Sequence, residues 1–380
     1  MQRSLWMLLL IAQTILGVRV GARLLRTARG KSIQPAQSEG PPRLVTIVVP
    51  VLNERDRLGP CLDGLIAQGE AVAEILVVDG GSDDRTQQLV EDFAHRDPRV
   101  RLVDASPIPD DWNGKAWGLQ VGLEQATAEW VLTIDADVRP APGLVAALMA
   151  HAGETALDVF SVATRQEIDD AGEGLLHPSM LATLVYRFGI PGGRYRRVDE
   201  VQANGQCFLA RREVLERIGG FAAVRESICE DITLARMLVD AGHEVGFFEA
   251  GDLVSVRMYP DWQATWRNWP RSLPMRDRYF GVRGIVGLAE VLLVQALPIP
   301  LLALTGLGRT RTPGLMQVNL VLLITRLGIL AGTARAYTHR PLTYWLSPLA
   351  DLPVALRLIA SALQREHTWR GRTLVRGGDR

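Results

Sequence analysis

The sequence has few cysteines and no net charge. Its three cysteines are odd in number and form no CxxC pair, so they indicate neither a disulfide framework nor a zinc site and fit a reducing compartment. Lys plus Arg and Asp plus Glu both number 42. This balance argues against a protein whose main task is to neutralise nucleic-acid phosphates. The six histidines are scattered without paired spacing, which argues against a histidine metal site. We therefore expect no nucleic-acid partner.

The N-terminus is apolar and is followed by positive charge. Fourteen uncharged residues run from Leu5 to Val18, and five basic residues follow between Arg19 and Lys31. A cleaved signal peptide carries its charges before the apolar run. The pattern therefore predicts an uncleaved membrane anchor over residues 1–21, with the rest of the chain cytoplasmic. A buried or amphipathic helix is the alternative, because fourteen residues fall short of the roughly 20 that span a bilayer.

Residues 32–43 are rich in Pro, Gly, Ser and Gln, a composition typical of a linker. From residue 44 to about residue 255, short β-branched runs alternate with helical stretches, which indicates βαβ units. The expected strands are nearly continuous in apolar residues, as in strands covered on both faces. We therefore predict an α/β domain over 44–255, with a mostly parallel, mixed sheet flanked by helices. The expected strands are Val45–Val49, Ile75–Val78, Val100–Val103, Trp130–Ile134 and Val159–Ala163, and the expected helices include Arg57–Gln68 and Thr86–His95.

Three long apolar segments follow in the C-terminal part, at residues 285–307, 314–334 and 342–363, and each is long enough to span a bilayer. Ionisable residues inside such segments are costly unless they pair or face a protein interior. An N-terminal anchor plus three spans would place the basic tail 364–380 on the side opposite the catalytic domain, against the positive-inside bias. A re-entrant or interfacial segment would remove this conflict, so we predict C-terminal membrane helices over 285–363 without fixing their number. The ionisable residues inside the segments are Glu290, Arg326, Asp351 and Arg357.

Acidic motifs follow the first two expected strands. The first strand leads into Pro50-Val-Leu-Asn-Glu54 and the second into Asp79-Gly-Gly-Ser82. In open α/β sheets, ligands bind beyond the carboxyl ends of the strands, and carboxylates there can accept hydrogen bonds from a base or from ribose hydroxyls. The alternative for Asp79 is a strand-ending turn, which Asp, Gly and Ser favour.

Two carboxylates, Asp135 and Asp137, directly follow the expected strand Trp130–Ile134. Mg²⁺ and Mn²⁺ prefer oxygen ligands and typically take one or two carboxylates plus substrate phosphates. Such an ion would offset the negative charge on a departing nucleotide diphosphate. The pair therefore predicts a divalent metal site that a diphosphate completes.

A third pair of acids, Glu230 and Asp231, opens an amphipathic helical stretch. Acids at a helix start are often only caps that the helix dipole favours. In the catalytic interpretation, one carboxylate takes the proton from an acceptor hydroxyl as that hydroxyl attacks. We assign this role to Asp231.

Five motifs now stand in order: Pro50-Val-Leu-Asn-Glu54, Val78-Asp79-Gly-Gly-Ser82, Gly114-Lys115-Ala-Trp-Gly118, Asp135-Ala-Asp137 and Glu230-Asp231. This order, over residues 44 to about 275, resembles the inverting family 2 glycosyltransferases of the GT-A fold. The resemblance implies direct displacement with inversion, a nucleotide diphosphate sugar donor and a divalent metal, Mg²⁺ or Mn²⁺. Family members often have two acids where this chain has Asp79-Gly80, which leaves the mode of base recognition open.

The same resemblance implies roles for individual residues. It places the base on Asp231 and metal ligation on Asp135 and Asp137. It places the donor contacts on Pro50, Glu54, Asp79, Lys115 and Asp135.

Three further segments resemble the cyanobacterial carotenoid 2'-O-glycosyltransferases and, more distantly, the hopanoid-associated glycosyltransferases. They are Pro109–Trp117, Ala203–Arg212 and Val256–Trp269. The resemblance implies a lipid-type acceptor hydroxyl, such as the 2'-hydroxyl of the carotenoid myxol, with a hopanoid or polyprenyl lipid as the alternative acceptor. A membrane-held catalytic domain suits an acceptor that stays in the bilayer.

The segment 256–283 is rich in Trp, Tyr and Arg, and Trp and Tyr favour the membrane interface. We interpret it as an interfacial helix that closes the active site, with Arg267 near the diphosphate and Trp269 near the acceptor. An interface anchor alone is the alternative. Asn204 is expected on the acceptor side, although Asn-Gly is often only a turn. The spacing of Gln263, Arg267 and Trp269 does not match the Gln-x-x-Arg-Trp motif of processive polysaccharide synthases, which argues against polymer synthesis.

Two other classes of protein fit the sequence less well. An inactive, donor-binding scaffold would be expected to have lost an essential carboxylate, and none is missing. A nucleotidyltransferase normally begins with a Gly-rich, basic loop that grips a triphosphate, and Pro50-Val-Leu-Asn-Glu54 is not such a loop. We therefore favour an enzyme that transfers a sugar.

Overall fold

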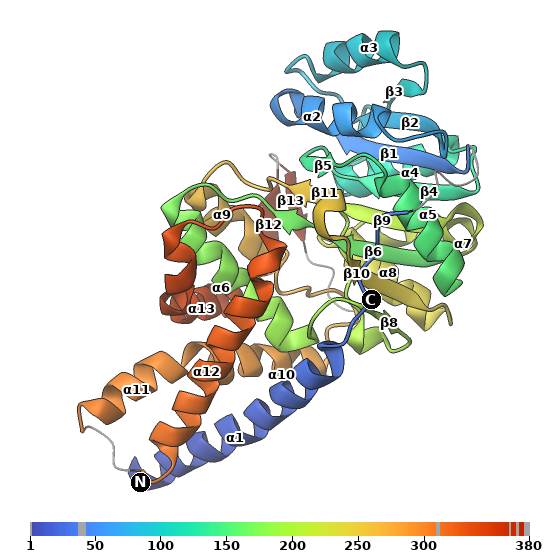
Figure 1. Cartoon of the computed structure of the whole chain (residues 1–380). Helices are drawn as coiled ribbons and strands as arrows, with labels where there is room; N and C mark the ends of the chain where they lie inside the picture. Colours follow the sequence, from blue (N-terminus) through green and yellow to red (C-terminus); the bar gives the residue numbers. More distant parts are fainter. Residues whose placement is uncertain (1, 37–42, 309–311, 365, 370–371, 376–380) are drawn as a thin grey trace.

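The computed structural model describes residues 2–36, 43–308, 312–364, 366–369 and 372–375. Two parts are visible in Figure 1: a sheet covered by helices, and a layer of long helices that begins with α1 and ends with α13. The N-terminal helix α1 lies beside the C-terminal helices, although the whole catalytic domain separates them in the sequence. The two ends of the chain therefore build the helical layer together.

An eight-stranded sheet has the order β3-β2-β1-β4-β9-β6-β10-β8. Its first four strands run parallel, β9 is antiparallel to both β4 and β6, and β8 is antiparallel to β10. A smaller sheet, β5-β11-β7, lies beside it. The strands are β1 Val45–Val51, β2 Val72–Asp79, β3 Val100–Asp104, β4 Trp130–Ile134, β5 Val138–Pro140, β6 Val159–Ala163, β7 Arg165–Gln166, β8 Gly193–Tyr195, β9 Cys207–Arg211, β10 Val245–Glu249 and β11 Val254–Val256.

The sheet is buried on both faces, because successive residues of a strand point to opposite sides. In β1, Ile47 and Val49 pack into one apolar cluster and Val48 packs into the other. Helices α2, α3 and α5 cover the first face, and α4, α7 and α8 cover the second. The prediction of a mostly parallel, mixed sheet flanked by helices is confirmed. These helices are α2 Arg55–Ile66, α3 Thr86–Arg96, α4 Gly114–Gln125, α5 Leu144–Thr155, α7 Arg212–Arg217 and α8 Glu230–Asp240.

The helical layer packs around α6 and shares one apolar core. Val20 of α1, Tyr186 of α6 and Leu358 of α13 are all buried in it. The helices are α1 Gln2–Thr27, α6 Ala171–Phe188, α9 Trp262–Asn268, α10 Val282–Glu290, α11 Pro298–Gly306, α12 Leu315–Thr333 and α13 Asp351–Leu363, with a π-helical turn, η5 Val291–Ala296. The 3-10 helices are η1 Val198–Glu200, η2 Gly220–Val224, η3 Gly251–Leu253, η4 Trp269–Arg271, η6 Ala334–Ala336 and η7 Leu342–Ala350.

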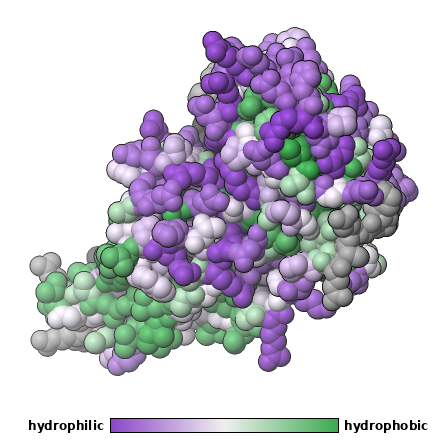
Figure 2. All heavy atoms as spheres, turned by 45° about the horizontal axis from the view of Figure 1, so that its top comes forward, coloured by the Kyte–Doolittle hydropathy of each residue, from purple (hydrophilic) through white to green (hydrophobic). Residues whose placement is uncertain are grey.

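Three helical stretches in the described part of the chain are long and apolar enough to cross a membrane: Ser4–Thr27, Leu315–Ala336 and Leu342–Leu363. The pair Val282–Ala296 and Pro298–Gly306 would count as a fourth, although it bends by 41°. Figure 2 shows hydrophobic residues gathered over the helical layer, whereas the surface of the catalytic domain is mostly hydrophilic. Contiguous exposed apolar surface of this kind marks a site of contact with a membrane or partner. Length and composition therefore agree with the predicted membrane helices.

Most ionisable residues inside the apolar segments pair with one another, as their cost in such a place requires. Glu290 accepts from Arg19 at 2.7 Å and from Arg23 at 2.8 Å. Arg326 pairs with Asp351 at 2.8 Å, and both side chains are almost completely buried. The pairing joins α1 to α10 and α12 to α13, so these charges contribute to the packing of the helical layer.

The beginning of the predicted linker is packed against the catalytic domain. Ser32 forms a parallel bridge to Glu249 at the end of β10, and the Ile33 side chain is 3% exposed. Ser32 and Ile33 are therefore not part of a free linker. Ile33 is the single large apolar residue of the segment 32–43, and it packs into the core under β10. Residues 37–42 lie outside the described part of the chain. Within the predicted basic tail, the structure describes the backbone of the hairpin β12–β13 (Glu366–Trp369 and Arg372–Val375).

Candidate active site

A cavity of about 400 Å³ lies at the carboxyl ends of β1 and β4. Its polar part is lined by residues from the loops after these strands and from the first turns of α4 and α8. This is the place where open α/β sheets bind ligands. The predicted residues that line the cavity are Pro50, Glu54, Lys115, Asp135, Asp137, Asn204, Asp231 and Trp269.

Lys115 connects the two acidic motifs. Its Nζ lies 2.8 Å from Asp135 Oδ1 and 2.9 Å from Glu230 Oε1. Asn113 caps α4 by accepting a hydrogen bond from the Lys115 backbone N–H at 3.1 Å, which fixes the start of this helix. Burial opposes the charge on Lys115, but the nearby carboxylates outweigh burial and hold the pKa of Lys115 well above its usual value. The lysine therefore stays protonated and keeps the carboxylates in one cluster.

Asp137 has an unsatisfied oxygen. Its Oδ1 is buried and has no hydrogen-bond partner among the described residues. The nearest cation to its other oxygen is Arg57, whose Nη1 lies 3.7 Å away. Burial and then the negative charge of Asp135 raise the pKa of Asp137 to about 7. A buried carboxylate oxygen without a donor is suited to coordinate a cation.

The described residues fit a metal that shares its ligands with a substrate. No group of three or more His, Cys, Asp or Glu side chains in the described part of the chain could hold a metal ion by itself. Asp135 and Asp137 provide two carboxylates, and Mg²⁺ or Mn²⁺ commonly takes one or two, with phosphate oxygens completing the shell. The donor set thus agrees with the predicted metal site.

Asp231 is held at the start of α8 by two backbone donors. Gly205 N–H donates to its Oδ2 at 2.6 Å, and Ile232 N–H donates to its Oδ1 at 2.8 Å. A Cβ on residue 205 would lie 3.0 Å from Lys115 Nζ and 3.1 Å from Asp231 Cβ, so a side chain there would crowd both residues. Burial and then the charge of Glu230 raise the pKa of Asp231 to about 6.

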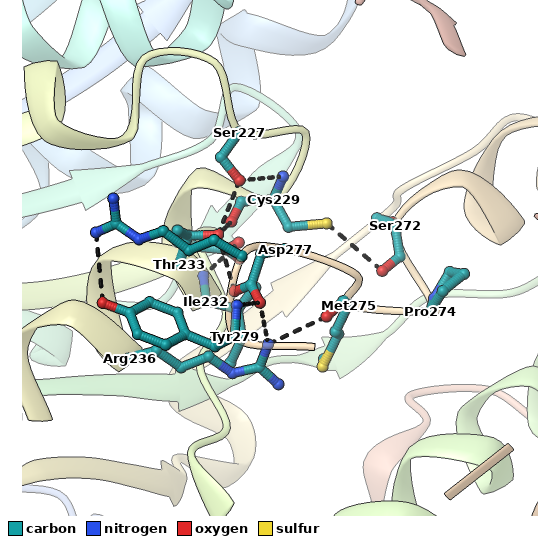
Figure 3. Close-up of polar contacts among 12 residues, drawn as sticks. Ser227, Cys229, Ile232, Thr233, Arg236, Ser272, Pro274, Met275, Asp277 and Tyr279 are labelled. Atoms are coloured by element: carbon teal, nitrogen blue, oxygen red, sulfur yellow. Dashed lines mark hydrogen bonds and ion pairs between the residues drawn. The ribbon is translucent and has the colours of Figure 1, made fainter. Parts of the chain in front are cut away.

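A polar network behind α8 fixes the position of its first turn (Figure 3). Asp277 accepts hydrogen bonds from Thr233 Oγ1 at 3.1 Å and from Arg236 Nη1 at 2.8 Å. Arg236 also donates to the Met275 carbonyl at 3.1 Å, and Cys229 Sγ lies 3.6 Å from the Ser272 carbonyl. The segment that follows η4 is thereby fastened to the helix that carries Asp231.

One side of the cavity is apolar. Leu181 and Leu184 of α6, Met258 and Trp269 line it, together with Phe247 of β10. Trp269 is itself held by stacking on His177, with ring centroids 4.2 Å apart. The cavity therefore combines a carboxylate cluster with apolar side chains suited to an apolar molecule.

Asp79 does not line the cavity. Its carboxylate accepts from the backbone of Gly81 at 3.1 Å, from the backbone of Ser82 at 3.0 Å and from Gln87 Nε2 at 2.7 Å. All of these donors belong to the loop and helix that follow β2, and the side chain is fully buried. The structure therefore gives Asp79 the role of a turn cap, which was the alternative interpretation, and Gly80 lines the cavity in its place.

Arg267 also lies elsewhere than predicted. It is exposed on α9, on the side opposite Thr265, which is buried, and it does not line the cavity. Because Pro270 ends the α-helical geometry, the chain continues as the 3-10 helix η4, and Arg271 lines the cavity instead. Asn204 and Trp269 do line the cavity, as expected for residues on the acceptor side.

Sequence reasoning missed Arg57, Arg271 and the α6 wall. Arg57 pairs with Glu54 at 2.5 Å, three residues earlier at the start of α2. This i,i+3 spacing on a predicted helix is a signal that could have identified it. The α6 wall has no such signal, because apolar residues of a helix look alike whether they line a cavity or a core.

The sheet order, the cavity beyond β1 and β4 and the paired carboxylates define the GT-A fold of nucleotide-diphospho-sugar glycosyltransferases. The family model described as Glycosyl transferase family 2 matches residues 46–219. The matched part of the chain, which contains Asp135 and Asp137 and ends after β9, is similar to family 2 glycosyltransferases.

Solved and curated proteins agree with this assignment. A mannosyltransferase of Pyrobaculum calidifontis, solved in complex with GDP-Man and Mn²⁺, is 20% identical, with a TM-score of 0.60 over 96% of this chain and 98% of that chain. This likeness is one of fold, and it includes the helical layer. The probable glycosyltransferase YdaM of Bacillus subtilis (strain 168) is 24% identical over 234 residues, which are 60% of this chain and 54% of that protein.

A shorter match is the dolichyl-phosphate beta-glucosyltransferase ALG5C of Trichomonas vaginalis (strain ATCC PRA-98 / G3). It is 36% identical over 100 residues, which are 24% of this chain and 28% of that protein. The chain thus spans about half the length of YdaM and less of ALG5C.

Proposed function

We propose that this chain transfers a sugar from a nucleotide diphosphate sugar to a hydroxyl of a lipid-type acceptor, with inversion, at the cytoplasmic face of a membrane. One observation supports the proposal: Asp231, the proposed base, lines the same cavity as the carboxylates Asp135 and Asp137 and as apolar side chains of α6. In this scheme residues 1–21 and 285–363 hold the domain 44–255 at the membrane.

The donor end of the cavity is the carboxylate cluster. Asp135 and Asp137 would hold Mg²⁺ or Mn²⁺, which when bound supplies positive charge for the departing nucleotide diphosphate. Lys115, Arg57 and Arg271 add fixed positive charge around the same cavity. Pro50 and Glu54, on the loop after β1, would contact the nucleoside.

The base is Asp231. A pKa of about 6 leaves this carboxylate mostly ionised at pH 7, yet still able to accept a proton. Its two backbone hydrogen bonds fix the carboxylate, so that the proton of an attacking hydroxyl is taken at a defined place. Direct attack on the sugar from the side opposite the nucleotide gives inversion.

The acceptor is proposed to be a carotenoid hydroxyl, such as the 2'-hydroxyl of myxol. The segments 109–117, 203–212 and 256–269 support this choice by their resemblance to carotenoid 2'-O-glycosyltransferases. The apolar wall from α6 and Trp269 supports any lipid acceptor. A polyprenyl lipid is the second candidate, because ALG5C is a dolichyl-phosphate glucosyltransferase. A hopanoid is the third.

The test is mass spectrometry of lipid extracts from a host that makes hydroxylated carotenoids. Wild-type chain, Asp231→Asn and empty vector are compared. A hexosyl or deoxyhexosyl carotenoid that appears only with the wild type supports the carotenoid acceptor. A glycosylated hopanoid or polyprenyl lipid that appears in its place rejects the carotenoid and keeps the lipid acceptor. No new glycolipid of any kind in hosts that supply all three acceptor classes contradicts the proposal.

A further inference from the structure

A second cavity, of about 880 Å³, lies beside the catalytic one. The segment 187–193 separates them: Gly189 and Pro191 line the catalytic cavity, whereas Ile190 and Gly192 line the second. The remaining walls come from the end of α1, the start of α10, β8 and α8. None of the proposed catalytic residues lines this cavity, so it needs an explanation of its own.

Positive charge dominates the second cavity. Among the described residues, nine arginines and three carboxylates line it. Glu290 pairs with Arg19 and Arg23, and Asp199 and Glu200 pair with Arg197 and Arg283. Arginines outnumber all carboxylates that reach them, so the cavity keeps an excess of positive charge. Such an excess attracts anions.

The deepest arginines have incomplete partners. Arg187 is 7% exposed and donates to the main-chain carbonyls of Thr183, at 3.0 Å, and Pro274, at 3.2 Å, and to that of Leu273. It has no carboxylate partner in the described part of the chain, and burial, then the charge of Arg236, lowers its pKa to about 9. Arg236 is 5% exposed, and its Nε is buried without a hydrogen-bond partner. Arg236 pairs with Asp277 at 2.8 Å, so of these two buried guanidinium groups Arg187 is the one without a carboxylate partner in the described part of the chain, and Arg236 keeps one buried N–H that could donate to a ligand.

The rim of the cavity is basic and apolar. Arg26 and Arg29 at the end of α1 are exposed, and neither has an ion pair in the described part of the chain. Arg26 lies in the last turn of the apolar helix Ser4–Thr27, and Arg29 follows two residues after its end. Across the opening, α10 presents Val282 and Ile285, which are 76% and 62% exposed. This is where two candidate membrane helices end next to each other, at the level of lipid head groups.

We propose that the second cavity binds the phosphate of an anionic membrane lipid. Arginine forks match phosphate oxygens and form strong charge-assisted hydrogen bonds with them. Arg26 and Arg29 attract the head group, the cavity admits its phosphate toward Arg187 and Arg236, and the acyl chains lie along α1 and α10. The inference does not depend on the proposed sugar transfer, because it concerns a separate cavity and a separate ligand.

A lipid phosphate in the second cavity would lie close to the segment 273–275, which also borders the catalytic cavity. Arg187 and Arg236 hold the carbonyls of Leu273, Pro274 and Met275, and Leu273 and Met275 also line the catalytic cavity. The phosphate would therefore lie behind the same segment that faces the substrates (Figure 3 shows the contacts of Arg236 with Met275 and Asp277).

The test is the binding of dihexanoyl phosphatidic acid, below its micelle concentration, to the full chain in a neutral detergent, by titration calorimetry at low salt. Arg26→Gln/Arg29→Gln removes two exposed charges at the rim and is expected to weaken binding about tenfold or more. The matched control, Arg96→Gln/Arg217→Gln, removes two exposed charges on α3 and α7, far from α1, and is expected to bind like the wild type.

Two further probes separate the sources of phosphate. Dihexanoyl phosphatidylcholine is expected to bind at least tenfold more weakly than the phosphatidic acid, because its head group has no net charge. Inorganic phosphate is expected to compete poorly, because it lacks acyl chains for the apolar rim. Equal affinity of wild type and the rim variant, equal binding of the two lipids, or full competition by inorganic phosphate at equal concentration would each overturn the proposal. No sugar donor is present, so the outcome is independent of catalysis.

Discussion

Two aspartates, the partly buried Asp137 in the catalytic domain and the fully buried Asp351 in the helical layer, show how differently the molecule treats negative charge. Asp351 accepts from Arg326 Nε at 2.8 Å, from Ser179 Oγ at 2.7 Å and from Gln295 Nε2 at 2.9 Å. Asp137 has one buried oxygen without a partner and one that lies 3.7 Å from Arg57. The satisfied carboxylate joins helices, whereas the unsatisfied one is prepared for a ligand.

The residues around each of the two aspartates show the same difference. Around Asp351, donors from α6, η5 and α12 converge on one carboxylate, so its charge is consumed in packing. Near Asp137, Lys115 pairs with two carboxylates, those of Asp135 and Glu230, and Arg57 is shared by Asp137 and Glu54. Excess negative charge of this kind is costly to bury unless a substrate or metal uses it. Buried charge by itself is therefore no sign of function, and at Asp137 the sign is a carboxylate oxygen without a donor in a residue that lines a cavity.

The largest effect is expected from Asp231→Asn. An amide cannot accept the proton of an attacking hydroxyl, so turnover should fall by about 10² to 10⁴-fold. The amide oxygen can still accept from one of the two backbone donors, Gly205 or Ile232, and asparagine has the same size as aspartate, so folding should be retained. Turnover and thermal unfolding of the two proteins, measured side by side, test this. An active variant with less than tenfold loss would reject Asp231 as the base.

The next largest effect is expected on the unfolding free energy, at the Arg326–Asp351 pair of the helical layer. Asp351→Leu leaves Arg326 buried without its partner, which should cost about 3–5 kcal/mol of unfolding free energy. The double variant Arg326→Met/Asp351→Leu removes both charges and should recover most of this loss. Unfolding in detergent measures both. If the double variant is as unstable as the single one, the pair has a role beyond mutual neutralisation.

A third prediction compares two arginines. The sequence places Arg267 near the diphosphate, whereas in the structure Arg271 lines the cavity. Arg271→Gln removes a positive charge from the cavity and should lower kcat/KM for the donor about tenfold, as expected for a lost charged hydrogen bond. Arg267→Gln is on the exposed side of α9 and should change kcat/KM less than twofold. Steady-state kinetics with varied donor decide this. The reverse order of effects would restore the sequence-based assignment.

The smallest effect is on pH dependence. Because burial raises the pKa of Asp231 to about 6, the base is increasingly protonated below that pH, and kcat should fall about tenfold per pH unit there. The contribution of Asp231 to the unfolding free energy should have the opposite pH dependence. The folded state binds this proton more tightly than the unfolded state, so the contribution of Asp231 is present at low pH and is lost as pH rises through about 6.

Asp231→Asn provides the control for the pH prediction. It should remove this part of the pH dependence of unfolding. A wild-type kcat that stays flat from pH 7 to pH 5 would contradict the assigned pKa.

The catalytic fold was predictable in large part because its strands are short, apolar and separated by clear turns. Trp130–Ile134 and Val159–Ala163 are confirmed with the predicted bounds. Strand β9 was not predicted, since the five residues Cys207–Arg211 contain a single β-branched or aromatic residue, Phe208. Its position between β4 and β6 is set by packing on both sides, which no local pattern records.

The site was predictable as a set of motifs but not as a set of contacts. Asp79 and Asp135 both follow buried strands, yet Asp79 caps its own turn whereas Asp135 pairs with Lys115 across the cavity. The difference depends on which backbone N–H groups the loop presents. Likewise, Pro270 turns the chain between Arg267 and Arg271, so that only the second faces the cavity. Directions of side chains after a turn are decided by the fold, not by spacing.

The most direct test of the central comparison is the binding of Mn²⁺ to the full chain in the presence of UDP or GDP, measured by electron paramagnetic resonance. Wild type, Asp137→Asn and the double variant Arg326→Met/Asp351→Leu are compared. We predict that Asp137→Asn binds Mn²⁺ at least about tenfold more weakly than the wild type, while the double variant binds it equally well. Equal binding by Asp137→Asn, with either nucleotide, would contradict the claim that the unsatisfied carboxylate is the metal ligand.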